Sequence, residues 1–176
     1  MRLSLVGTLA VALLAALGAV VPAGATGSTA IETLDTLDTA IVARVNVIRQ
    51  AHGLPPMRAS ARLGRAADRH SRAMGMYGFF AHESRDGTSY RQRIRRDYPQ
   101  GGYGVWSVGE NLAFDSEQIS AADAVGMWMG SPLHRAALLS KTWREIGVSA
   151  LRVSSAPGIY EGDDVTLVTV DFGLRR

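Results

Sequence analysis

The chain has 176 residues, with 19 Lys and Arg against 16 Asp and Glu, a formal net charge of +3 at pH 7 and no cysteine. This length predicts one domain that buries a single core without disulfide bonds. So small an excess of positive charge excludes a strongly basic nucleic-acid-binding protein, and we expect no nucleic-acid partner.

Residues 1–25 have the three parts of a secretory signal peptide. Arg2 gives a positive start, residues 3–21 form an apolar run, and residues 22–25 end in the small-x-small pattern that signal peptidase recognises. The apolar run is also about as long as a membrane span, so a membrane anchor is the alternative. We expect cleavage near Ala25 and export to the periplasm or the medium of a bacterium, because exported animal domains are usually cross-linked.

Two helices are predicted after this segment. Residues 26–38 are small, polar and acidic, which predicts a flexible leader. From residue 39 apolar residues recur at helical spacing until Gly53, which ends the first helix. Ser60 caps a second helix, and His70 belongs to its apolar stripe or the edge of it. No second donor follows His70 at four residues, so we expect it to pack and not to bind a ligand.

Two histidines and one carboxylate stand at the ends of predicted elements and form the candidate site. His82 follows two aromatic residues that would anchor it at the edge of the core, and Glu110 follows an apolar, strand-like run. His134 lies on a short helix with Ser131 as N-cap and Pro132 at the first helical position. Two imidazoles and a carboxylate suit a divalent metal site or a proton-handling polar cleft.

Structural roles are open for three polar residues of this region. Glu110 could hold the adjacent loop by hydrogen bonds without meeting a ligand. Asn111 is expected to tie down a turn, and Ser131 is as easily a helix cap as a site residue.

A basic cluster between His82 and Glu110 has two interpretations. The favoured one is a solvated helix face, and the alternative is a contact with an acidic wall polymer or lipid headgroups at the envelope surface. The cluster consists of Arg91, Arg93, Arg95 and Arg96.

The second half of the chain predicts the fold class. Ser120 and Asp123 form a capping box at the start of a helix, and residues 146–150 and 165–172 have the pattern of strands. Helices come first and antiparallel strands come last, so the sequence predicts an α+β sandwich with helices packed over a sheet.

Several motifs together resemble the CAP superfamily, also called SCP domains, in its cysteine-free bacterial form. They follow the family order along nearly all of the mature chain: Asn46 and Arg49, Gly53-Leu54-Pro55-Pro56, Phe80-Ala81-His82, Asp86-Gly87, Gly109-Glu110-Asn111, Trp128, Ser131-Pro132-Leu133-His134-Arg135 and Ile146-Gly147-Val148. The resemblance implies one α-β-α sandwich over residues 39–176, with a central cleft that carries two histidines and two acidic residues.

The resemblance assigns His82, Glu110 and His134 to three of those four cleft positions. The second acid stands three residues after the helix tryptophan in many eukaryotic members, and here that position is Ser131. A Zn²⁺ ion at His82, His134 and Glu110 would have at most three protein ligands and a position for water. Equally, the missing carboxylate could leave a weak metal site or none.

The favoured function is an exported, monomeric binding module without turnover. Its cleft, formed by His82, Glu110, His134, Ser131 and Asn111, would hold a divalent metal, a peptide or a lipid-like ligand. The alternative is a metal-dependent hydrolase, protease-like or cleaving envelope polymers, with a water activated at His82 and His134. A serine triad is disfavoured because Ser131 caps the helix of His134 and no Gly-x-Ser-x-Gly or His-Glu-x-x-His motif is present. A structural envelope protein with a vestigial cleft is a third possibility.

Overall fold

A computed structural model describes residues 28–116 and 118–176, so the expected signal peptide lies outside the described residues. In chain order the elements are β1 (Ala30–Thr33), α1 (Asp35–Ala51), β2 (Arg58–Ala59), α2 (Ala61–Tyr77), α3 (Tyr90–Asp97), β3 (Trp106–Asp115), α4 (Ala121–Gly130), α5 (Pro132–Leu138), β4 (Glu145–Ser154), a 3₁₀ turn (Gly158–Tyr160) and β5 (Val165–Arg175).

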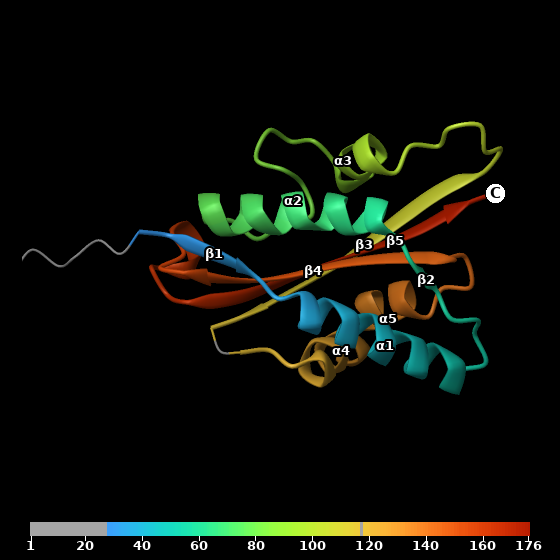
Figure 1. The fold of residues 1–176 in the computed structure, drawn as a ribbon, viewed down its shortest axis with the longest axis horizontal. Coiled ribbons are helices and arrows are strands. Elements are labelled where there is room, and N and C mark those ends of the chain that lie inside the picture. The colour runs from blue at the N-terminus through green and yellow to red at the C-terminus, as the bar shows by residue number, and fades with distance from the viewer. Residues whose placement is uncertain (1–27, 117) are drawn as a thin grey trace, which may run out of the picture.

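These elements form three layers around a five-stranded sheet. Figure 1 shows α2 and α3 over one face of the sheet and α1, α4 and α5 over the other. The strand order is β1-β4-β5-β3, with the short β2 beside β4. All strand pairs are antiparallel except β2 with β4. The predicted α+β fold, an α-β-α sandwich around an antiparallel sheet, is confirmed.

The prediction of a flexible leader over residues 26–38 is wrong for the part that begins at Ala30. β1 pairs with β4 over its full length, and α1 already starts at Asp35. The carboxylate of Asp38 accepts a 2.6 Å hydrogen bond from the backbone N–H of Ala150. A strand of four residues is too short to show an alternating pattern, and its partner lies far along the chain, so the sequence did not reveal it.

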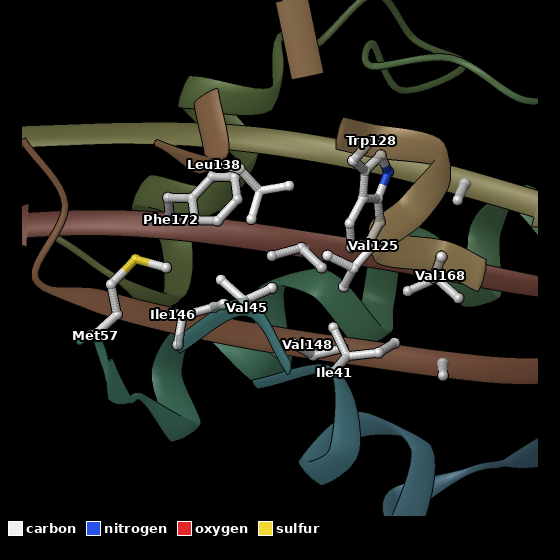
Figure 2. Packing of buried hydrophobic residues seen from close by; sticks show 14 of the residues in the cluster. Ile41, Val45, Met57, Val125, Trp128, Leu138, Ile146, Val148, Val168 and Phe172 are labelled. Carbon is white, nitrogen blue, oxygen red and sulfur yellow. The ribbon is translucent and has the colours of Figure 1, made fainter. Parts of the chain in front are cut away.

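The face of the sheet toward α1, α4 and α5 holds the larger apolar core. Figure 2 shows Ile41 and Val45 of α1 together with Val125 and Trp128 of α4 at this core. Trp128 is fully buried, and its Nε1–H donates a 2.8 Å hydrogen bond to the carbonyl of Leu112 in β3. This contact fixes α4 to β3, the strand that carries Glu110.

On the opposite face α2 lies directly on β4. A Cβ atom added at Gly147 would come within 2.1 Å of the backbone nitrogen of Gly64 in α2, so the helix approaches the strand closely because Gly147 has no side chain. α2 ends at Gly78, whose φ of 66° is the left-handed conformation that glycine adopts readily. The chain then turns back toward the sheet and brings His82 to it.

Helix starts follow the predicted capping chemistry in part. Ser120 and Asp123 form the predicted capping box at α4, and α5 begins at Pro132 as predicted. Ser131 occupies the N-cap position of α5, but its side chain makes no capping hydrogen bond.

Within the described ranges no helix is long and apolar enough to cross a membrane.

Candidate functional site

The face of the sheet under α2 carries polar side chains near its centre. Glu110 of β3 lies opposite Asp171 of β5 in the antiparallel register, and both are buried. Two residues before Asp171, the hydroxyl of Thr169 accepts a 2.7 Å hydrogen bond from the hydroxyl of Ser71 in α2. Residues two apart on a strand share a face. The two strands therefore aim a strip of polar groups at α2.

Glu110 is the centre of a three-residue contact. Its Oε1 lies 2.8 Å from Nδ1 of His82, and its Oε2 accepts a 2.6 Å hydrogen bond from the guanidinium of Arg93. Arg93 also donates a 3.2 Å hydrogen bond to the backbone carbonyl of His82. An ionised carboxylate only accepts, so Nδ1 of His82 carries the proton of their hydrogen bond. Nε2 is then the ring nitrogen of His82 that is left for another partner.

The prediction that the basic cluster is a solvated face is wrong for Arg93. Arg91, Arg95 and Arg96 are exposed, but Arg93 is only 7% exposed. Arg93 lies two residues from both Arg91 and Arg95, which is about 200° around a helix, so it faces away from them. It is turned toward the sheet, where the buried charge of Glu110 offsets the cost of burying a guanidinium. Sequence spacing showed four similar arginines and could not show that one of them has a buried partner.

The charges of the site differ from residue to residue. The hydrogen bond with Glu110 raises the pKa of His82 above its ordinary value, although burial works against this. Burial raises the pKa of Glu110, but His82 and Arg93 more than offset it, so the net pKa is lowered. Burial and the neighbouring charge of Glu110 raise the pKa of Asp171 well above its usual range. The two shifts have opposite directions, so the surroundings favour the ionised form of Glu110 and the protonated form of Asp171.

His70 packs as predicted but borders a pocket. It is almost fully buried, its Nε2 lies 2.8 Å from the carbonyl of Ala81, and burial lowers its pKa. The pocket has a volume of about 210 Å³ and is lined by His70 and Arg93 together with Arg69 and Arg96. Within the described residues, Nδ1 of His70 and Nε and one terminal nitrogen of Arg93 have no hydrogen-bond partner.

His134 lies on the other side of β3. The side-chain nitrogen of Asn111 donates a 3.1 Å hydrogen bond to the backbone carbonyl of His134, which ties the start of α5 to the strand. This is a structural contact of the kind predicted for Asn111. Partial burial and the charge of His82 lower the pKa of His134. The structure therefore places His134 close enough to His82 for an electrostatic effect, but not in contact with Glu110.

The predicted zinc ligands do not fit a metal centre in this arrangement. In the described part of the chain no group of three His, Cys, Asp or Glu side chains is placed to hold a metal ion. Both carboxylate oxygens of Glu110 are engaged, one with His82 and one with the positive charge of Arg93. Ser131, which stands where the second acid would be expected, brings no carboxylate. As a direct Zn²⁺ ligand, Glu110 would have to share an oxygen with His82 or Arg93.

Two members of the site were not predicted from the sequence, namely Arg93 as a partner of Glu110 and Asp171 as a buried acid beside it. Asp171 had a visible signal, because it is an acidic residue inside the apolar run of residues 165–172. Its carboxyl group is fully buried, and the side chain that interacts with it most closely is the neighbouring acid Glu110. Such a group is normally avoided in a core, so its position beside Glu110 marks the site.

The fold and the site define a class of protein: an α-β-α sandwich in which a carboxylate of the edge strand orients a histidine beside it. Residues 42–172 match the CAP family, described as the Cysteine-rich secretory protein family. The chain belongs to this family, although it contains no cysteine. The membrane protein YlbC of Bacillus subtilis is 30% identical over 112 residues, which are 64% of this chain and 31% of YlbC. The chain thus spans less than a third of that relative.

Solved structures of bacterial proteins share the fold. An extracellular SCP-domain protein of Bacillus anthracis has a TM-score of 0.61 and 25% identity, over 78% of this chain and 40% of that one. An outer surface protein of Borrelia burgdorferi has a TM-score of 0.64 and 22% identity, over 82% and 98%. A cysteine-rich secretory protein of Staphylococcus aureus has a TM-score of 0.52 and 18% identity, over 79% and 39%.

The first prediction concerns the control of His82 by Glu110. Glu110→Gln is expected to lower the pKa of His82, because the hydrogen bond to the carboxylate is the largest cause of its upward shift. Without that carboxylate, burial and the positive charge of Arg93, which both lower the pKa of His82, have less to oppose them. Histidine titration by NMR measures the change, with the resonances of His52, outside the site, as reference for an intact fold. An unchanged titration of His82 would contradict the role given to Glu110.

The second prediction concerns Asp171 and stability. The folded protein holds a proton on Asp171 at pH values where the unfolded chain has released it, so this residue makes the free energy of unfolding fall as pH rises above the ordinary carboxyl pKa. Asp171→Asn keeps the shape and removes the titration. Urea unfolding between about pH 4 and 8 is expected to show a smaller decline for the variant than for the wild type. Equal declines would show that Asp171 is ionised in the folded protein.

Proposed function

We propose that the protein is an exported CAP-domain binding module that holds an acidic group of a peptide or lipid-like ligand at His82, without turnover. The observation that carries the proposal is the way His82 is held. Glu110 fixes the ring through Nδ1 at 2.8 Å, yet the side chain of His82 is 42% exposed. An oriented imidazole with one nitrogen left for a partner is suited to recognise a ligand.

The charges around His82 favour an acidic ligand over a cation. The positive charge of Arg93 and the negative charge of Glu110 offset one another at 2.6 Å. Burial raises the pKa of Asp171, which favours its neutral form. When His82 is protonated, which its raised pKa favours, the ring can itself pair with an anion, and the nearby negative charge of Glu83 offsets part of its charge. A carboxylate or phosphate of a ligand would be attracted to it, and a divalent metal would be repelled.

The observed contacts give little support to hydrolysis. Within the described residues no serine or threonine hydroxyl forms a hydrogen bond with the ring of His82 or His134. An acyl transfer would need such an activated nucleophile. The alternative of a metal-dependent hydrolase needs a metal ion at His82 and His134, and no group of three metal-binding side chains lies together among the described residues.

Export is part of the same proposal. It is supported by the pattern of residues 1–25 and by the relatives, among which one is an extracellular protein and another an outer surface protein. The exported product is expected to begin at Thr26, and N-terminal sequencing or intact mass measures this. An uncleaved N-terminus in the membrane fraction would favour an anchor, in line with the relative that is called a membrane protein.

The experiment that tests ligand recognition uses small probes of defined chemistry. Acetate and an N-acetylated dipeptide, which both carry a carboxylate, are expected to shift the imidazole resonances of His82 saturably in the millimolar range. His82→Gln should abolish binding of the same probes, measured by calorimetry because this variant lacks the reporting ring. The control variant His52→Gln should preserve it, because His52 lies at the C-terminal end of α1, outside the site.

Other outcomes of this titration would overturn the proposal. Saturable zinc binding that involves both His82 and His134, with no response to carboxylates, would establish a metal site in its place. Turnover of an ester or peptide substrate that is lost in His82→Gln would show that the protein is an enzyme. No saturable response to any of the probes would leave His82 as a structural partner of Glu110.

A further inference from the structure

One end of the molecule carries a groove that is lined mainly by cations. Its volume is about 550 Å³, and five of the side chains along it are basic: Arg58, Lys141, Arg144, Arg175 and Arg176. They come from three stretches that are far apart in the sequence, namely β2, the loop before β4 and the end of β5. Figure 1 shows β2 and the C-terminal end of β5 at the same end of the sheet. The fold therefore assembles a basic groove that no single segment of the sequence contains.

The positive charge of this groove is only partly compensated. Glu145 lies 3.6 Å from Arg58 and 3.6 Å from Arg175. In the part of the chain that the structure describes, no other carboxylate forms an ion pair with any of the five basic side chains. One shared carboxylate against five cations leaves a clear excess of positive charge. An anion at this groove would therefore be attracted from solution.

Two of the five arginine and lysine side chains are held in place by the fold. Arg144 donates hydrogen bonds from one terminal nitrogen to the carbonyls of Lys141 at 2.8 Å and Trp143 at 2.9 Å. The guanidinium of Arg175 lies 4.0 Å from the ring centre of Tyr98. Arg58, in contrast, is 81% exposed. The groove thus has two kinds of cation. Arg144 and Arg175 are fixed along its wall, and exposed side chains such as Arg58 can move to contact a ligand at little cost in desolvation.

The opposite end of the molecule is acidic. Glu32 in β1 lies there, as do the acidic residues of the turn between β4 and β5, one of which, Asp164, is paired with Arg152 at 3.3 Å. These turn residues are Glu161, Asp163 and Asp164. In Figure 1, β1 and this turn lie at the end of the sheet away from β2 and the C-terminal end of β5. The small net charge of +3 therefore hides a separation of charge along the sheet, which would orient the protein with its basic groove toward a polyanion.

We propose that this groove binds a soluble, chain-like polymer with repeated phosphate groups. Four of its five cations are arginines, whose guanidinium groups bind phosphate oxygens in pairs. The groove is concave, so it fits a chain better than the flat surface of a membrane. It shares no residue with the His82 site, so it neither needs nor tests the function proposed there. It also differs from the predicted envelope contact of residues 91–96, in which Arg93 is buried against Glu110.

Binding to inorganic polyphosphate by the protein purified after export tests this proposal. The test variant replaces three exposed cations of the groove and leaves the two that the fold holds: Arg58→Gln, Lys141→Gln and Arg176→Gln. The control variant removes the same charge from exposed positions outside the groove: Arg44→Gln, Arg65→Gln and Arg85→Gln. At about 0.15 M salt we expect at least a tenfold loss of affinity in the test variant and less than about threefold in the control. The slope of log affinity against log salt should fall by about 2 in the test variant.

Three results would overturn the proposal. Equal losses in the two variants would show that only the overall charge matters. Binding of polyglutamate as tightly as polyphosphate would show that the groove does not select phosphate. Tighter binding to vesicles that contain phosphatidylglycerol than to polyphosphate would make the ligand a membrane surface and not a polymer. His82→Gln is expected to bind polyphosphate like the wild type, which separates this proposal from the one at His82.

Discussion

The buried carboxylate of Glu110 sets the arrangement of the segments around it. An ionised carboxyl group under α2 would be very costly without compensation, and Arg93 and His82 together provide it. To reach Glu110, Arg93 must turn inward from α3 and His82 must be drawn in by the loop that follows α2. One carboxylate therefore fixes a helix, a loop and a strand, and it also fixes the tautomer and the exposed edge of His82.

The alternation of side chains along β3 explains how histidines from two different layers come near each other. Glu110 points to the face under α2, where it holds His82, and the next residue, Asn111, points to the opposite face, where it holds the backbone of His134. β3 pairs only with β5 among the described strands. Because it is an edge strand, the layers above and below the sheet meet beside it, and the electrostatic effect between His82 and His134 follows from this position.

The two faces of the sheet have different physical tasks. The face toward α1, α4 and α5 is apolar and supplies the main packing, with Trp128 hydrogen-bonded to β3 (Figure 2). The face toward α2 mixes apolar contacts with the polar strip around Glu110 and Asp171. The charge of Glu110 and burial raise the pKa of Asp171, and the protonated form that this favours avoids repulsion between two acids in neighbouring strands. Stability and recognition are thus separated between the layers, while the basic groove lies at a third place, the end of the sheet.

The sequence by itself determined the α+β class and the helix starts at Ser120 and Pro132, because helical spacing, capping residues and strand alternation are local properties. It also singled out His82, Glu110 and His134 as candidate site residues. It did not determine β1, the burial of Arg93, the raised pKa of Asp171 or the gathering of Arg58, Lys141 and Arg175. Each of these depends on which distant segment lies alongside. Only the tertiary structure decides that, because the cost of burying a charge and the field of a group of charges depend on neighbours in space and not on neighbours in the chain.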